Sequence, residues 1–170
     1  MKVIFLDVDG VLNSETLYHT QDRQLHGHSY YWNKLDPKAV ARLQRIVEAT
    51  GASIVVSSSW RIIDADYEAL LSLLPEFGCT APILGRTCRY GHAIEVLGAH
   101  DGRKPDHGGN VPRGWEIETW LLENPGATSF CILDDDGDMD FLQDHLVQTS
   151  WKTGLLDEHV EKAINLLLES

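Results

Sequence analysis

The sequence contains no apolar run close to the ~20 residues that a membrane-spanning helix needs. Its first residues also lack the succession of charged region, long apolar stretch and cleavage site that marks a signal peptide. Cysteine is rare, with three residues among 170 and no metal-binding spacing between them. This usage predicts reduced thiols rather than a disulfide framework or a zinc site. We therefore expect a cytoplasmic protein with no membrane partner.

Positive charge is also scarce. The chain has 14 lysines and arginines against 26 aspartates and glutamates, a formal net charge of −12. Binding along a nucleic acid needs a basic face, so this balance predicts no extended nucleic-acid surface. It leaves open a site that grips one terminal phosphate, because a divalent cation changes the local field.

Short apolar runs alternate with segments of helical period along the chain. We predict strands at residues 3–6, 52–57, 81–84, 128–133 and 146–149, helices that begin near Asp36, Asp64, Pro112 and Asp157, and a long polar loop at 86–112. Alternating strands and helices predict an α/β fold with a parallel sheet and right-handed crossovers. The length suits one domain with a real core, which we place over residues 1–170.

Two carboxylates directly follow the first apolar run. Asp7 and Asp9 come after residues 3–6, which read as a strand buried on both faces. Alternation places both side chains on the same side of an extended backbone, and Gly10 lets the chain turn away sharply. Burying carboxylates is costly unless a cation or hydrogen bonds compensate. Because open α/β sheets bind ligands at the carboxyl ends of their strands, this pair predicts a functional site.

A second acidic strand end lies later in the chain, where residues 130–133 run into Asp134 and Asp135. Between the two acidic ends, residues 54–56 form an apolar run that ends in Ser57 and Ser58. The alternative reading of Asp7 and Asp9, a solvated turn after an edge strand, is disfavoured because the same arrangement occurs twice.

These motifs, taken in order, resemble those of the haloacid dehalogenase (HAD) superfamily of phosphatases and phosphotransferases. They are DxDGVLN at 7–13, VVSSSWR at 55–61, GRT at 85–87, RGWEIETWL at 113–121 and ILDDD at 132–136. More narrowly, they are similar to the HAD domains of Swiss Army Knife RNA repair proteins. The resemblance covers nearly the whole chain. It implies a Rossmann-like HAD fold with a parallel sheet of about five strands and helices on both faces. Only 22 residues separate Asn13 from Asp36, so the cap is expected to be minimal, a helical turn and a flap within 14–34.

The resemblance also implies catalytic roles. Asp7 would be the nucleophile that forms an aspartyl-phosphate, and Asp9 would protonate the leaving oxygen and then activate water. A Mg²⁺ ion would be held by Asp7, the backbone carbonyl of Asp9, Asp134 and Asp135, since oxygen ligands suit this ion. The carboxylates that follow are expected in a solvated acidic loop; they are Asp136, Asp138 and Asp140.

The same resemblance implies ligands for the substrate phosphate. Ser57 would donate a hydrogen bond to a phosphate oxygen, with the register open by one residue to Ser58. Arg61 either reaches the phosphate or is a surface arginine at the start of a helix. The family also needs a cation, for which Arg113 and Lys104 are the candidates. Arg113 is preferred, because one helix and a turn separate it from the second acidic strand end.

The leading hypothesis is a Mg²⁺-dependent phosphatase that hydrolyses a phosphomonoester. The substrate would be a small phosphorylated molecule such as a nucleotide, or a nucleic-acid 3′-end phosphate, the latter from the resemblance alone. It would be gripped at its phosphate and nearest group. The alternative is a non-catalytic phosphate-binding or regulatory module. The complete set of Asp7, Asp9, Ser57 and Asp134 disfavours this alternative, because decayed members usually lose a carboxylate.

Overall fold

Five short apolar segments pair as strands: β1 (Lys2–Leu6), β2 (Ser53–Val56), β3 (Ile83–Arg86), β4 (Ser129–Asp134) and β5 (Leu146–Gln148). They form one sheet in the order β3-β2-β1-β4-β5, and every pairing is parallel. The structure, a computed structural model, describes residues 1–20, 35–105, 109 and 111–169. The remaining elements are α1 (Glu15–Thr20), α2 (Pro37–Thr50), η2 (Ser59–Arg61), α3 (Asp64–Glu76), α4 (Tyr90–Asp101), α5 (Arg113–Glu123), η3 (Asp140–His145) and α6 (Asp157–Leu168).

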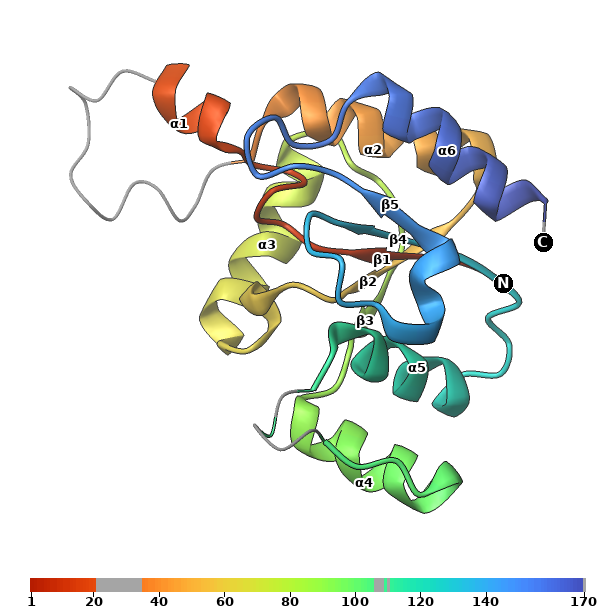
Figure 1. Cartoon of the computed structure of the whole chain (residues 1–170). Helices are drawn as coiled ribbons and strands as arrows, with labels where there is room; N and C mark the ends of the chain where they lie inside the picture. Colours follow the sequence, from red (N-terminus) through yellow and green to blue (C-terminus); the bar gives the residue numbers. More distant parts are fainter. Residues whose placement is uncertain (21–34, 106–108, 110, 170) are drawn as a thin grey trace.

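Alternating side chains of the sheet face two separate helical layers (Figure 1). Ile4 and Leu6 of β1 belong to a buried cluster with residues of α2, α3 and α6. Val3 and Phe5 point the other way, into a cluster with Ile117 and other residues of α5. Helix α4 packs outside α5, through a small cluster of its own. The parallel sheet with helices on both faces confirms the predicted α/β fold.

The strand register aligns the carboxyl ends of β1, β2 and β4 with one another. Leu6 pairs with Val56 of β2 on one side and with Leu133 of β4 on the other. The ladder continues by one step, because the Asp7 amide donates to the Leu133 carbonyl and the Ser57 amide to the Leu6 carbonyl, both at 2.9 Å. The residues that follow β1, β2 and β4 therefore lie side by side at one edge of the sheet.

Helix α2 shows how local signals fix the predicted elements. The Asp36 side chain accepts a hydrogen bond from the Lys38 amide at 2.8 Å and caps the helix, with Pro37 as its first residue. The helix ends at Gly51, whose left-handed conformation (φ 68°) lets its amide bond to the Val47 carbonyl. The helix thus begins where the sequence predicted.

The prediction of one long polar loop at 86–112 is wrong for its 12-residue central part. Helix α4 occupies residues 90–101 and ends at Gly102 in the left-handed conformation, with φ 76°. Its buried side chains, Ala93 and Leu97, lie one turn apart and contact Trp115 of α5. So few apolar residues, set among glycines and histidines, gave too weak a helical period to detect.

The predicted flap falls mostly outside the described residues, although α1 lies within the predicted segment 14–34. The expected minimal cap is therefore described only in this helix. Among the described residues, every helix is too short or too polar to cross a bilayer.

A close backbone contact sets the position of α5. A Cβ atom added to Gly114 would overlap the backbone of Met139, which is fully buried. Gly114→Ala should therefore lower the unfolding temperature, because overpacking costs about 1–3 kcal/mol. The matched control is Gly91→Ala. Both glycines are the second residue of a helix, but nothing lies within 4 Å of a Cβ at Gly91. Thermal unfolding by circular dichroism should show the first variant destabilised and the second equal to wild type or more stable. Equal unfolding temperatures would contradict the contact.

Candidate active site

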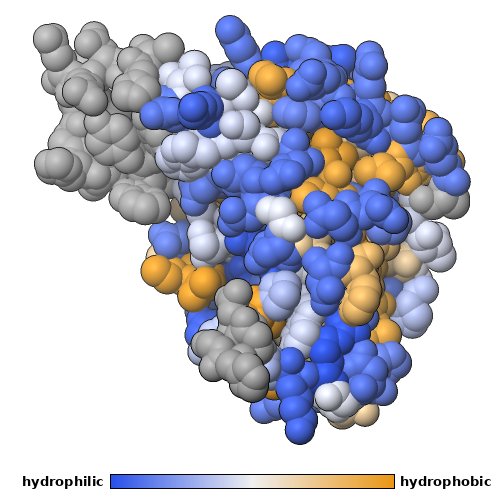
Figure 2. Space-filling view, in the orientation of Figure 1, coloured by the Kyte–Doolittle hydropathy of each residue, from blue (hydrophilic) through white to orange (hydrophobic). Residues whose placement is uncertain are grey.

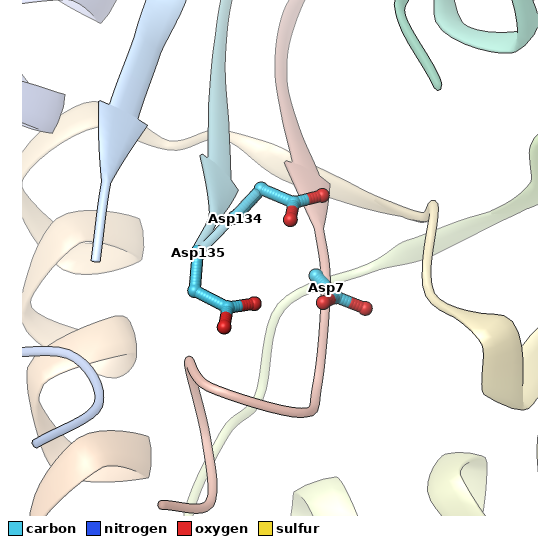
Figure 3. Close-up of side chains that lie close together, drawn as sticks. All are labelled: Asp7, Asp134 and Asp135. Atoms are coloured by element: carbon cyan, nitrogen blue, oxygen red, sulfur yellow. The ribbon is translucent and has the colours of Figure 1, made fainter. Parts of the chain in front are cut away.

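Three carboxylates converge at the level ends of β1 and β4 (Figure 3). Asp7 follows β1, and Asp134 and Asp135 stand at the end of β4. One oxygen of each lies within 4.8 Å of one oxygen of each other carboxylate. Asp7 is 5% exposed and Asp134 is fully buried. The structure thus brings together three of the residues that the sequence predicted as metal ligands.

The alternation of the sheet explains which face the cluster occupies. Phe5 faces α5, so Asp7, two residues later, faces the same way. The same parity in β4 places Asp134, two residues after Ile132, on the α5 side. The first residue of α5 is Arg113, so its guanidinium is delivered directly to the acidic strand ends.

Arg113 links all three strand ends. Its Nη1 lies 3.7 Å from Asp7 Oδ1, and its Nε lies 3.5 Å from Asp134 Oδ2. The Nη1 group also donates a hydrogen bond to the Ser57 carbonyl. Lys104, the other candidate cation, is exposed after α4, and none of the described ion pairs joins it to these carboxylates. Of the two, Arg113 is the one that the fold places beside Asp7 and Asp134.

Burial dominates the electrostatics of the cluster. It raises the pKa of Asp7 against the opposing charge of Arg113. Burial and the neighbouring charge of Asp7 raise the pKa of Asp134 to about 7, again against Arg113. Burial lowers the pKa of Arg113, but the charges of Asp134 and Asp7 outweigh it and hold the pKa above its ordinary value. One cation therefore compensates only part of the cost of burying the carboxylates.

Asp9 lies in the turn after β1, so the turn and not strand alternation positions its side chain. The amides of residues 11–13 all donate to the Val8 carbonyl and close this turn. The Asp9 carboxylate accepts one hydrogen bond from the Asn13 amide group at 2.8 Å and one from the Trp60 indole at 3.0 Å. Both oxygens are thus fixed, and the carboxylate is held toward the segment that follows β2.

The serine segment divides its roles between two residues. Ser57 continues the ladder of β2, is fully buried, and its hydroxyl has no hydrogen-bond partner among the described residues. Ser58 is also buried, but its hydroxyl accepts from the Trp60 amide and caps η2. The structure therefore leaves the Ser57 hydroxyl with unused hydrogen-bonding capacity, as a ligand-binding group requires.

Arg61 is neither a surface residue nor free to face a phosphate, so both sequence readings need correction. It is 6% exposed, and one terminal nitrogen donates to the carbonyls of Ser57 and Ser58 at 3.0 and 2.8 Å. The other donates to the Cys88 carbonyl and to the Glu116 carboxylate in a buried ion pair. Burial lowers the pKa of Arg61 and raises that of Glu116. Arg61 therefore stabilises the backbone of the serine segment, Ser57 and Ser58, by hydrogen bonds to their carbonyls.

Asp136, Asp138 and Asp140 are exposed, as expected of a solvated acidic loop, but two of them also make specific hydrogen bonds to α5. The Asp138 carboxylate accepts a hydrogen bond from the Arg113 amide at 3.1 Å, and its carbonyl accepts one from Gly114 at 3.2 Å. Asp140 accepts from the Trp115 indole at 2.7 Å. Although exposed, these two carboxylates anchor the start of α5, because the first amides of a helix have no partner within it.

Gly10 lets the two acidic loops approach each other. Its φ is 75°, and a Cβ at this position would lie 2.6 Å from Asp135 Oδ1. The Gly10 carbonyl accepts a hydrogen bond from the Thr149 hydroxyl at 2.7 Å, which fixes the turn from the β5 side. The space occupied by the Asp135 carboxylate therefore exists only because residue 10 has no side chain.

The donor set fits a divalent cation with oxygen ligands. Three carboxylates lie within ligand-sharing distance, and Asp134 Oδ2 is buried with no hydrogen-bond partner among the described residues. Among the residues that the structure describes, no histidine or cysteine joins this cluster. All-oxygen sites of this kind suit Mg²⁺ better than zinc. Asp134 Oδ2 makes its ion pair with Arg113 at 3.5 Å but accepts no hydrogen bond among the described residues, and burial keeps the pKa of Asp134 raised, so this oxygen has capacity for a further cation.

Comparison with known families agrees with this geometry. A family model described as the HAD domain in Swiss Army Knife RNA repair proteins matches residues 3–160. The chain belongs to this family. Neither a curated protein nor a solved structure matches it. Membership confirms the resemblance found in the sequence, and with the parallel sheet it establishes a Rossmann-like HAD fold. It also indicates a phosphatase-type hydrolase.

Sequence reasoning missed three side chains that shape the site of this HAD domain. Asn13 was within reach of detection, since it lies four residues from Asp9, but Trp60 lies 51 residues away. Glu116 is 55 residues from Arg61. No local sequence pattern predicts side-chain contacts between residues so far apart in the chain.

The buried carboxylates should make the metal-free protein less stable as pH rises. The pKa of Asp134 is about 7 in the folded state, above the ordinary value of 3.8. The contribution of Asp134 to the free energy of unfolding is therefore fully present below pH 3.8 and is lost as the pH rises through 7. In EDTA, the unfolding temperature of Asp134→Asn relative to wild type should increase by at least about 3 °C from pH 5 to pH 8, since 1 kcal/mol corresponds to about 2–4 °C for a domain of this size.

Asp157→Asn is the control, because Arg42 and Arg45 hold the pKa of exposed Asp157 below its ordinary value. Its difference from wild type should stay constant above pH 5. Adding Mg²⁺ at pH 8 should raise the unfolding temperature of wild type and not that of Asp134→Asn. A pH-independent difference for Asp134→Asn would contradict the electrostatic assignment.

Proposed function

We propose that this HAD domain is a Mg²⁺-dependent phosphatase that hydrolyses a phosphomonoester through an aspartyl-phosphate on Asp7. One observation carries the proposal: Asp7 is buried at a strand end, between Arg113 and the carboxylates of Asp134 and Asp135. A buried carboxylate that is flanked by a cation and a fitting metal site is arranged to meet a phosphate rather than to stabilise the fold.

In the first step, a carboxylate oxygen of Asp7 attacks phosphorus, and the bond from phosphorus to the leaving oxygen breaks. Asp9, in its protonated form, transfers its proton to that oxygen, so the product leaves as an alcohol. Asn13 and Trp60 hold both Asp9 oxygens in place for this transfer. The proposal assigns binding of the transferring phosphoryl oxygens to the Arg113 guanidinium, which lies 3.7 Å from Asp7, and to the Ser57 hydroxyl, which has no hydrogen-bond partner among the described residues.

In the second step, Asp9 acts as a base. It takes a proton from a water molecule whose oxygen attacks phosphorus, and the bond between Asp7 and phosphorus breaks. Inorganic phosphate is released, the Asp7 carboxylate is restored, and Asp9 is again protonated. A bound Mg²⁺ would supply positive charge that reduces repulsion between Asp7 and the incoming phosphate. Asp7, Asp134 and Asp135 would hold it, with the Asp9 carbonyl as a further ligand.

The substrate is proposed to be a small phosphorylated molecule, such as a nucleotide, or a nucleic-acid end held at its terminal phosphate and nearest group. The net charge of −12 supports this limit, because it leaves little basic surface for a polyanion. Membership in a family of HAD domains from RNA repair proteins supports the nucleic-acid end.

The alternative of a non-catalytic phosphate-binding module has one observation in its favour: both Asp9 oxygens are already hydrogen-bonded. Each oxygen nevertheless has a second lone pair, so these bonds do not prevent proton transfer. The catalytic proposal accounts better for Asp9, since a module that only binds phosphate gains nothing from another fixed carboxylate.

Asp7→Asn tests the catalytic proposal. It removes the nucleophile while keeping its shape, so phosphatase activity should fall by more than roughly 10³-fold. Because burial raises the pKa of Asp7, the neutral side chain should not lower the unfolding temperature. The measurement is phosphate release from a panel of nucleotides, sugar phosphates and 3′-phosphorylated oligonucleotides with Mg²⁺. Wild-type turnover in the variant would exclude the aspartyl-phosphate route, and no turnover by wild type on any substrate would favour the binding module.

Arg113→Ala and Lys104→Ala compare the two candidate cations. Arg113 contacts Asp7 and Asp134, so its loss should lower kcat/KM by about 10²-fold, as for one donor to a developing anion. Lys104 is exposed, and its loss should leave kcat/KM near the wild-type value. Both variants are assayed side by side with the same substrate, and circular dichroism checks the fold. The reverse order would move the cationic role to the segment after α4.

A further inference from the structure

A hollow lies between η2 and the start of α3. It is lined by Ser59, Trp60, Ile62, Ile63 and Asp66, and its volume is about 290 Å³. Figure 2 shows hydrophobic surface at the left edge of the molecule, in the place where η2 and the start of α3 lie in Figure 1. Two of the lining side chains, Ile62 and Ile63, are 45% and 59% exposed. Two adjacent exposed isoleucines at one hollow give it an apolar rim, which is the surface that an apolar ligand group would contact.

Arginine side chains hold the backbone of the segment that lines this hollow. Arg86 donates to the Arg61 carbonyl at 2.7 Å, and Arg89 donates to the Ile62 carbonyl at 2.6 Å. Arg61 itself holds the Ser58 carbonyl at 2.8 Å. Backbone carbonyls before, within and after η2 thus accept hydrogen bonds from arginine side chains. The hollow is a pre-formed feature, as small-molecule sites generally are.

Trp60 connects the hollow to the proposed chemistry. It lines the hollow and is 6% exposed, so it forms a wall rather than a stacking platform. Its indole donates to Asp9 Oδ2 at 3.0 Å. Asp9 must lie against the leaving oxygen to protonate it. The group attached to that oxygen therefore leaves the phosphate next to Trp60, toward the hollow.

The shape and charge of the hollow define what fits there. Its volume is at the lower end of the range of about 300–1,000 Å³ for ligand pockets, which suits one ring system and not a chain. Ile62 and Ile63 offer apolar contact to the faces of a ring. Asp66, exposed in the first turn of α3, accepts hydrogen bonds from ring donors and repels a second phosphate.

We propose that this hollow binds the leaving group of the substrate and selects a flat aromatic or heteroaromatic ring. The inference rests on the proposed phosphatase function and adds to it a specificity site made of Ile62, Ile63, Trp60 and Asp66. Either a nucleobase or a simple aryl group supplies a ring of this chemistry, so the test includes both.

The test compares substrates that differ only in the ring. The first pair is adenosine 3′-monophosphate and 1-O-methylribose 3-phosphate, which share a secondary ribose alcohol as leaving group. The second pair is 2-phenylethyl phosphate and ethyl phosphate, which share a primary alcohol. For wild type we expect kcat/KM to be at least about ten-fold higher for the ring-bearing member of one or both pairs, as for apolar groups that enter a fitted pocket. The pair that shows the preference identifies the source of the ring.

The variants place the preference at the hollow. Ile63→Ser removes exposed apolar contact without opening the core, and it should bring the ratio of kcat/KM within a responding pair toward one. Leu168→Ser is the matched control, because Leu168 is 52% exposed at the end of α6 and should leave both activity and ratio unchanged.

The outcomes separate this inference from the function on which it rests. Hydrolysis with a ratio near one in both pairs for wild type would overturn the leaving-group site and leave the phosphatase standing. A ratio that Ile63→Ser does not lower would also overturn it. Absence of hydrolysis of all four phosphomonoesters would overturn the proposed function, and with it this inference.

Discussion

The ion pairs of Arg113 with the buried carboxylates are the interactions on which the site depends. Asp7 and Asp134 follow adjacent parallel strands, so the register of the sheet forces them together whatever their charges. Removing these two charges from water costs several kcal/mol per charge unless an opposite charge or hydrogen bonds compensate. Only part of that compensation comes from the protein, because Asp134 Oδ2 meets Arg113 at 3.5 Å but accepts no hydrogen bond among the described residues. The fold thus holds electrostatic free energy that a cation can release on binding.

Helix α5 carries this compensation, and its own position is set by polar contacts. Asp138 receives the amide of Arg113, Gly114 allows close contact with the Met139 backbone, and Glu116 pairs with Arg61. The helix therefore touches the loops after both β2 and β4. A shift of α5 would move the guanidinium away from Asp7 and would also remove a support from the serine segment. The stability of one helix and the electrostatics of the site are linked through the same few residues.

The sequence predicted the elements whose signals are local. Apolar runs identified the strands, and Asp36 and Gly51 delimited α2. The placement of Asp7 and Asp134 also followed, because parallel strands share one edge for their carboxyl ends. Helix α4 escaped prediction, since its buried face is little more than Ala93 and Leu97.

Side-chain contacts between segments that are distant in sequence also escaped prediction. Arg61 looked like a phosphate ligand or a surface residue, because its partner Glu116 belongs to a helix that only the folded chain brings near. The acidic residues after β4 looked like a solvated loop for the same reason. Asp138 and Asp140 find their donors at the start of α5, 25 residues earlier in the chain. Composition describes such residues as charged, but only the tertiary arrangement decides whether the charge faces water or an amide.

Gly10 has a consequence for any exchange of active-site loops between related domains. The Asp135 carboxylate occupies the volume that a side chain at residue 10 would need, and Thr149 holds the Gly10 carbonyl. The loops after β1, β4 and β5 are therefore complementary in shape, although 139 residues separate Gly10 from Thr149 in sequence. A graft of one of these loops alone would separate it from the two loops whose shape it complements. Recombination between homologues should keep all three segments from one parent, and these segments can be inherited as a unit even though the chain encodes them far apart.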